Sequence, residues 1–242
     1  MASGHPKTES IDAARAAVGV RGHRIRNLAK AEERRREILN GAARAFAHAG
    51  FDATNMDQIA RECGLAKGHI YHYFRSKEEI FTEIRVDAHS RALERLTAIV
   101  PAAESDPELA LRQAISAVVA RTFPEMQGYT DVERYEPLLG NPVSLSPENR
   151  KRIRDLSRRY EQSFASILRR GIEKGVFVPG DAKLITFMMV SAANSVFGWY
   201  REGGRWKPQF IIDQVTEQLL RSVLRSGSDR NRPRSSSPRK SA

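Results

Sequence analysis

The chain has little of what disulfide formation, secretion or membrane insertion requires. Its 242 residues include one cysteine, Cys63, which excludes an internal disulfide and favours a reducing compartment. No apolar run approaches the ~20 residues that a membrane-spanning helix needs. The first thirty residues contain no apolar stretch suited to a secretory signal. Together these absences predict a soluble, cytoplasmic protein that does not enter a membrane.

Catalytic signatures are missing as well. The sequence contains no phosphate-binding glycine loop, no H-E-x-x-H, no G-x-S-x-G and no cysteine pair. His69 and His72 are spaced to share one side of a helix, yet no carboxylate or thiol beside them completes a metal site. We therefore predict no enzymatic activity, no cofactor and no metal.

Positive charge is abundant, but much of it lies at the two ends of the chain. The net charge is +11 at pH 7, and residues 1–30 and 226–242 each contribute +4 of it. Charge of this kind attracts phosphates without reading a base sequence. We predict a disordered basic arm over 1–30 and a disordered basic tail over 226–242. The arm is either a solvated extension or a segment that touches DNA beside the main contact.

The most informative segment begins at Thr54 and has the pattern of two short helices joined by a tight turn. Thr54 with Asp57 three residues later is a helix start signal, because their side chains can accept hydrogen bonds from the free backbone amides of the first turn. Gly64 suits the left-handed backbone that ends such a helix. The apolar positions of the first helix share one face at the spacing of Met56, Ile59 and Ala60.

A second short helix follows a turn of about three residues, Cys63–Leu65, as in a helix-turn-helix. Its apolar residues anchor it, and its outward side combines basic, small and aromatic residues, the set that a base-reading helix needs. Ser76 starts a third helix, where Lys77 is placed to meet a phosphate. The predicted DNA-contacting residues are Thr54, Asn55, Lys67, Gly68, His69, Tyr71, His72 and Lys77.

These motifs make residues Glu32–Ile84 closely similar to the N-terminal domain of the TetR family of transcriptional regulators. The resemblance implies a dimeric, all-helical repressor whose C-terminal domain binds a small effector. Two positions depart from the family pattern: Ala66 stands where Ser or Thr is frequent, and His69 stands where a smaller residue is usual. The positions that carry the resemblance are Phe46–Gly50, Phe51, Thr54, Ile59-Ala60, Gly64, Lys67-Gly68, Tyr71–Phe74 and Ser76–Glu79.

We predict an all-α fold with two domains between the arm and the tail. Residues 31–78 form a three-helix DNA-binding domain with the helix-turn-helix, and residues 79–225 form a helical effector-binding and dimerisation domain. The helix from Ser76 to about Ile99 links the two domains, because its apolar positions continue along its whole length.

The last two apolar helices predict a dimer interface. Residues 181–200 are apolar on nearly every side, which requires burial all round, and residues 208–224 carry a continuous apolar stripe. Two such helices from each subunit would form a symmetric four-helix interface, which the family resemblance also implies. The predicted interface residues are Leu184, Met188, Val196, Ile211, Val215, Leu219 and Val223.

Aromatic residues and methionines spread over several helices are either ordinary core or the lining of an effector pocket. The C-terminal stretch resembles that of TetR relatives that control fatty-acid, steroid or aromatic-acid catabolism and respond to acyl-coenzyme A thioesters: NSVFGWYREGGRWKPQFIIDQVTEQLL. If so, Arg169, Arg170 or Arg201 meets the phosphates of coenzyme A; otherwise they are solvated charges. The predicted pocket residues are Phe123, Tyr135, Phe164, Phe187, Met188, Phe197, Tyr200 and Arg201.

The functional hypothesis is a homodimeric repressor that binds a palindromic operator in double-stranded DNA and is released by a small effector. Dimerisation fits a DNA site of two-fold symmetry, because it sets the distance between two reading helices. Two alternatives stay open: a nonspecific architectural DNA-binding protein driven by its basic ends, and an activator of the TetR type.

Overall fold

The computed structural model describes residues 8–123, 126–140 and 145–225, with side chains described from residue 28 onward. Within these ranges the secondary structure consists of ten α-helices and two short 3₁₀-helices, besides an isolated bridge between Phe177 and Leu224. The predicted all-α class is confirmed. No helix among the described residues is long and apolar enough to cross a membrane. The predicted tail, 226–242, lies outside the described residues.

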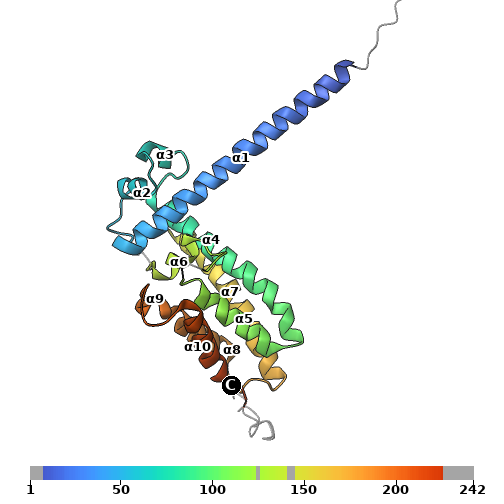
Figure 1. Ribbon diagram of the computed structural model, residues 1–242, viewed down its shortest axis with the longest axis vertical. Helices are drawn as coiled ribbons and strands as arrows, with labels where there is room; N and C mark the ends of the chain where they lie inside the picture. The colour runs from blue at the N-terminus through green and yellow to red at the C-terminus, as the bar shows by residue number, and fades with distance from the viewer. Residues whose placement is uncertain (1–7, 124–125, 141–144, 226–242) are drawn as a thin grey trace, which may run out of the picture.

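The N-terminal part consists of three helices: α1 (Thr8–Ala49), α2 (Met56–Glu62) and α3 (Lys67–Tyr71) (Figure 1). Their facing sides share one core with the start of the next helix. This core includes Ile38, Leu39, Ala42, Phe46, Ile59, Ile70, Phe74, Ile80 and Phe81.

Helix α1 is much longer than predicted and runs out from the body as a rod (Figure 1). The structure places residues 8–30 in this helix, so the prediction of a disordered arm is wrong from Thr8 onward. The segment contains no proline and is rich in alanine and arginine, which favour helix even where nothing packs against it. A segment without sustained apolar periodicity has no face to bury in a core, but it can still be helical.

The C-terminal part packs its helices around α5, below the N-terminal domain in Figure 1. Asp106 caps α5 through its side chain, and Pro107 occupies the first turn. The core of this part includes Leu96, Leu111, Ile115, Val119, Phe123, Phe164, Leu168 and Phe177. The elements are α4 (Lys77–Ile99), η1 (Val100–Glu104), α5 (Pro107–Ala120), α6 (Asp131–Tyr135), η2 (Glu136–Leu138), α7 (Pro147–Glu173), α8 (Ala182–Asn194), α9 (Val196–Trp199) and α10 (Pro208–Arg221).

Helix α4 belongs to both cores. Ile80, Phe81 and Ile84 at its start are buried in the N-terminal core, and Leu96 near its end is buried in the C-terminal core. The expected continuous link between the two domains is present.

Residues 181–200 do not form one continuous helix, and a single subunit does not bury them on all sides. The segment is broken into α8 and α9 near Ser195, and α8 exposes Leu184, Phe187 and Met188 on its outer side. In α10 the predicted outer stripe points inward instead, because Ile211 and Val223 pack into the C-terminal core. Val196 is buried in the same core, so these three residues are not free to meet a second subunit.

Candidate nucleic-acid interface and cavity

Helix α2 begins one residue later than predicted. Its N-cap is Asn55, whose side-chain oxygen accepts a hydrogen bond from the amide of Gln58 at 3.0 Å. The Gln58 side chain in turn accepts from the Asn55 amide at 2.7 Å, which completes a capping box. Two amides at the start of α2 are thereby satisfied. Asn55 itself is exposed and remains a candidate for DNA contact.

Thr54 is only 1% exposed, so the prediction that it contacts DNA is wrong. Its hydroxyl donates a hydrogen bond to the carbonyl oxygen of Gly50 at 2.7 Å, which holds the turn that follows α1. The threonine therefore positions the helix-turn-helix from inside it.

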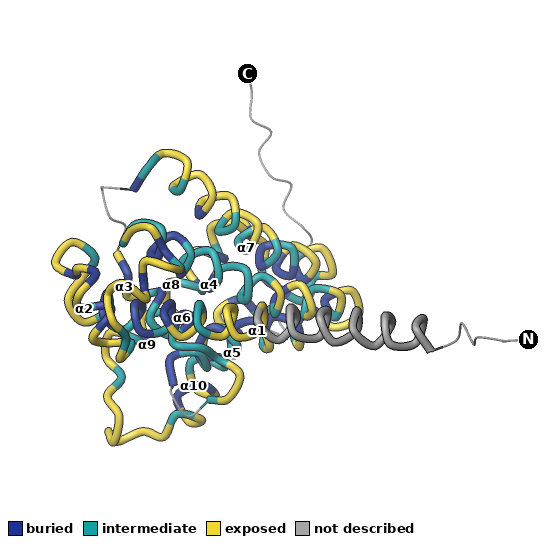
Figure 2. The backbone as a smooth tube through the Cα atoms, turned by 90° about the horizontal axis from the view of Figure 1, so that it is seen from above, coloured by how far each residue is buried: buried dark blue, intermediate teal, exposed yellow. Residues whose placement is uncertain are grey.

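Helix α3 has one buried side and one bare side. Ile70 and the following Phe74 are buried in the core, as predicted, and they fix the helix against α1. Tyr71 is 47% exposed, and Figure 2 colours most of α3 as exposed. No side chain caps α3, because its N-cap is Ala66. The exposed residues of the helix and its C-cap are Lys67, Gly68, His69, Tyr71 and His72.

The two histidines of this face belong to a small aromatic group with Tyr73. The His69 ring lies parallel to the Tyr73 ring at 6.3 Å and edge-on to His72 at 6.1 Å between centroids. The described residues hold no group of three or more metal-ligating side chains. Both rings are exposed and are available to a polar partner.

Lys67 lies at the start of α3 and forms an exposed ion pair with Asp57, with 2.9 Å between Nζ and Oδ2. The hydrogen bond to Asp57 raises the pKa of Lys67, so its ammonium is charged at neutral pH. An exposed pair of this kind is weak, and the ammonium can exchange its carboxylate for a DNA phosphate.

Lys77 has a structural role that the sequence did not reveal. Its Nζ donates to the carbonyl oxygens of Phe51 at 2.7 Å and Thr54 at 2.8 Å, and it lies 4.3 Å from the centre of the Phe51 ring. These carbonyls follow the end of α1 and would otherwise lack a partner. The ammonium is therefore held by backbone carbonyls of the protein, and its contact with a phosphate stays a prediction.

The half-buried Cys63 packs against α1. Its Sγ is 3.7 Å from the carbonyl oxygen of Ile38. A Cβ on Gly41 would come within 2.5 Å of this sulfur, so a glycine at that position permits the close approach. Burial raises the pKa of the Cys63 thiol to about 11, which keeps it protonated at neutral pH.

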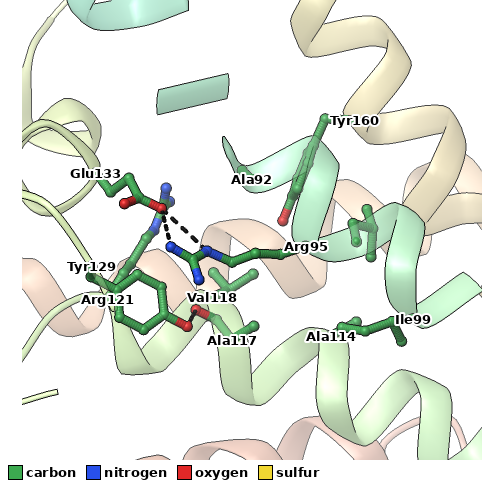
Figure 3. A pocket seen from close by; sticks show the side chains of 11 residues that line it. Ala92, Arg95, Ile99, Ala114, Ala117, Val118, Arg121, Tyr129, Glu133 and Tyr160 are labelled. Carbon is green, nitrogen blue, oxygen red and sulfur yellow. Dashed lines mark hydrogen bonds and ion pairs between the residues drawn. The ribbon is translucent and has the colours of Figure 1, made fainter. Parts of the chain in front are cut away.

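A cavity lies in the C-terminal part between α4, α5, α7 and α8. It consists of two neighbouring chambers whose linings share Ala92, Arg121 and Tyr160. The wide chamber has a volume of about 290 Å³ and a polar lining that includes Arg85, His89, Glu136, Ser157, Glu161 and Asn194. The narrow chamber, of about 30 Å³, has an apolar wall of Leu96, Ile99, Ala114, Ala117 and Val118 (Figure 3).

Most of the predicted pocket residues do not line this cavity, and only Phe187 does. Phe123 and Phe164 are core residues, and Tyr200 packs edge-on against Phe123 at 4.7 Å between ring centres. The large apolar side chains fill the space between helices, and arginines, acids and small residues surround the space that remains. The other predicted residues, Tyr135, Met188, Phe197 and Arg201, also lie outside the lining.

Two buried carboxylates at the cavity are paired with arginines. Arg85 Nη1 is 2.6 Å from Glu136 Oε1, and Arg95 Nη2 is 2.9 Å from Glu133 Oε1, as Figure 3 shows for the second pair. Burial lowers the pKa of His89, so its ring is neutral at pH 7. The sequence offered no signal for these pairs, because their partners are 38 and 51 residues apart.

Helix α6 connects the cavity to the DNA-binding domain. Glu133 of α6 lines the narrow chamber, and the neighbouring Val132 is buried in the N-terminal core. Asp131 forms an ion pair with Arg44 of α1, which also bonds Glu62 of α2 at 2.8 Å. The short α6 therefore touches α1, reaches α2 through Arg44 and contributes to the wall of the cavity.

Comparisons with known proteins point to one family. The profile described as "Bacterial regulatory proteins, tetR family" matches residues 38–84, and the one described as "Tetracyclin repressor-like, C-terminal domain" matches residues 129–223. The transcriptional repressor KstR2 of Mycobacterium tuberculosis is 26% identical over 195 residues, which cover 80% of this chain and 94% of KstR2.

Solved structures agree. PfmR of Thermus thermophilus, a TetR family transcriptional regulator, is 35% identical, with a TM-score of 0.60 over 76% of this chain and 97% of PfmR. AibR, solved with isovaleryl coenzyme A and operator DNA, is 22% identical, with a TM-score of 0.66 over 77% of this chain and 98% of AibR. With both of its domains matched and a 35% identical relative covered almost completely, the chain belongs to the TetR family of transcriptional regulators.

Proposed function

We propose that this regulator is a homodimeric repressor that leaves a palindromic operator when a small effector fills the cavity. The observation that carries the proposal is the position of α6, which contacts α1 on one side and supplies Glu133 to the cavity on the other. An effector that displaces the cavity wall would therefore displace the support of the DNA-binding domain.

The proposed DNA contacts are made by the bare side of α3 and by the start of α2. Lys67 supplies charge to a phosphate, and Gly68 allows close approach because a Cβ there would meet no neighbour. His69, Tyr71 and His72 offer rings and polar atoms to base edges. Asn55 lies beside them at the N-cap of α2.

The proposed dimer interface is the outer side of α8 with the neighbouring α10. Met188 is 65% exposed and Leu184 is 59% exposed, which is unusual for large apolar side chains on a monomer surface. Val215 and Leu219, which the sequence also predicted at the interface, are half-buried, so only part of each side chain can contact a second subunit. Exposed apolar residues near α8 and α10 that extend this surface are Phe187, Trp199, Trp206 and Phe210.

The proposed effector class is an acyl compound, including acyl-coenzyme A thioesters. The support is the resemblance of the C-terminal stretch to regulators of lipid and aromatic-acid catabolism. AibR, which has the same fold, accommodates isovaleryl coenzyme A and operator DNA. The coenzyme A part of such a ligand would have to extend beyond the cavity. Of the arginines predicted to meet its phosphates, Arg170 is paired with Glu104 at 2.5 Å and Arg169 is exposed.

A genome-wide map of bound sites, followed by gel shifts on a recovered site, tests the proposal. We expect one or a few palindromic sites and strong preference over random DNA. Tyr71→Ala and His69→Ala should each weaken operator binding by ~1–3 kcal/mol if the side chain touches a base edge, with little change on random DNA. Equal losses on both DNAs would contradict base reading. Lower expression of the neighbouring genes after deletion of the regulator would identify an activator instead.

A further inference from the structure

The cavity contains three arginines, of which one differs from the others. Arg85 and Arg95 are each neutralised by a buried glutamate, Glu136 and Glu133. Arg121 lies where the two chambers meet, and it forms no ion pair with any carboxylate of the described residues. The Arg121 side chain is half-buried, and a guanidinium that is partly withdrawn from water without a neighbouring anion lowers stability.

The hydrogen bonding of Arg121 is incomplete. Its Nη2 donates to the Oδ1 of Asn194 at 2.7 Å, and its guanidinium lies 5.8 Å from the centre of the Phe197 ring. Its Nε is buried and has no hydrogen-bond partner among the described residues. Asn194 and Phe197 orient the side chain, and they leave donors of the guanidinium without an acceptor.

The groups around Arg121 leave room for an anion. Tyr160 lies beside it, and burial raises the pKa of the Tyr160 hydroxyl, so this group is a neutral donor. The remaining carboxylate of the wide chamber is Glu161, which forms no ion pair with Arg121 within the described part of the chain. Arg121 Nε is a buried atom without a hydrogen-bond partner, whereas the Glu161 oxygens are not among such atoms.

We propose that Arg121 binds a carboxylate of the effector, a refinement that rests on the proposed function of the cavity. Guanidinium and carboxylate match in charge and geometry, and a carboxylate would satisfy the unpaired donors of Arg121. The wide chamber has space on the order of ten water molecules, which suits a medium-chain or aromatic acid. The end of the acid's apolar part enters the narrow chamber beside Leu96 and Val118.

Two sources can supply this carboxylate: a free organic acid, or an acyl-coenzyme A whose acyl group ends in a second carboxylate. Calorimetry and thermal unfolding of the full-length protein without DNA distinguish the two sources. The compounds to be compared are octanoate, octanamide, octanoyl-coenzyme A and suberyl-coenzyme A. A free acid is indicated if octanoate binds and octanamide does not. The second source is indicated if suberyl-coenzyme A binds more tightly than octanoyl-coenzyme A. Equal binding within each pair, or no binding of either carboxylate compound, overturns the proposal.

The variant Arg121→Gln should weaken binding of the carboxylate compound by ~10- to 100-fold, the range expected for a charged hydrogen bond. Because the unliganded guanidinium is unpaired, the same variant should keep or raise the melting temperature, which a structural arginine would lower. Glu161→Gln should tighten binding by removing a like charge. Arg112→Gln is the matched control, since Arg112 lies on α5, which Arg121 follows as the C-cap, but it pairs with Glu217 outside the cavity. Loss of binding in the control as large as in Arg121→Gln would refute the assignment.

Operator release is measured separately by gel shift. If Arg121→Gln abolishes carboxylate binding but no ligand changes operator affinity, the proposed function fails and the role of Arg121 stands. If a neutral ligand releases the operator equally from both proteins, the role of Arg121 fails and the proposed function stands.

Discussion

At the scale of single residues, two lysines only ten positions apart in the helix-turn-helix region have opposite roles. The ammonium of Lys77 is held by backbone carbonyls and joins the loop after α1 to α4. The ammonium of Lys67 projects from the bare side of α3 and meets only an exposed carboxylate. Charge alone does not distinguish them, and only the surroundings decide which one remains available to DNA.

Replacement of each lysine by methionine separates these roles. Lys77→Met should lower the free energy of unfolding by ~1–3 kcal/mol, because it leaves carbonyls without a charged donor. Lys67→Met should leave the melting temperature unchanged but weaken DNA binding and reduce its salt dependence by about one phosphate contact. Chemical denaturation and gel shifts at two salt concentrations measure both effects. An unchanged stability of Lys77→Met would contradict the structural role.

Cys63 gives a second prediction at this scale. Its pKa is raised to about 11 by burial, so the folded state favours the thiol. This contribution to stability is present below the pKa of the unfolded cysteine, near 9, and is lost as the pH rises toward about 11. At pH 8 a thiol reagent should react slowly with the native protein and rapidly in urea. Rapid reaction of the native protein would favour a redox-sensing role instead.

At the scale of elements, α6 is placed to couple the two domains. The helix has only five residues, and its Thr130 cap is completed by Glu133, the same side chain that pairs with Arg95 at the cavity. Its other contacts include the amide of Val132, which donates to the Asn40 side chain of α1 at 3.2 Å. A ligand that disturbs the Arg95–Glu133 pair therefore acts on the cap of the helix that supports α1.

The variant Asp131→Asn tests this coupling, because it removes the charge that pairs with Arg44. We expect the variant to bind the effector as the unmodified protein does. The coupling energy between effector binding and operator binding, typically ~1–3 kcal/mol, should decrease. Operator affinity measured with and without effector gives the coupling directly. Asp155→Asn on the exposed side of α7 serves as the control. Undiminished coupling in Asp131→Asn would assign the transmission to α4 alone.

At the scale of the whole molecule, the exposed apolar side of α8 is the surface on which the proposed dimer would form. Regulators of this family bind DNA, and the proposed dimer would set the distance between two DNA-binding domains. The outer side of α8 lies in the C-terminal part, away from α3 (Figure 1). A dimer formed there leaves both reading helices open to the same DNA duplex.

Substitution of Met188→Glu should dissociate the proposed dimer, because a charge replaces a central apolar contact worth ~2 kcal/mol or more at an interface hot spot. Sedimentation should show a monomer, and operator affinity should fall while random DNA binding persists. Leu109→Glu is the matched control, since Leu109 is a similarly exposed apolar residue on α5. A dimer that survives Met188→Glu would place the interface elsewhere.

The sequence alone determined the helix-turn-helix, the family and the limits of most helices. These depend on local signals: Gly64 in the left-handed conformation, Asp106 with Pro107, and the apolar spacing of α2. The tertiary structure alone decided which residues those helices expose. Lys77, Thr54 and Ile211 looked available in sequence, but distant carbonyls and core contacts engage them. Packing places residues far apart in sequence within reach, and helical periodicity does not specify which neighbour covers each face, so the charged cavity around Arg121 emerged only from the fold.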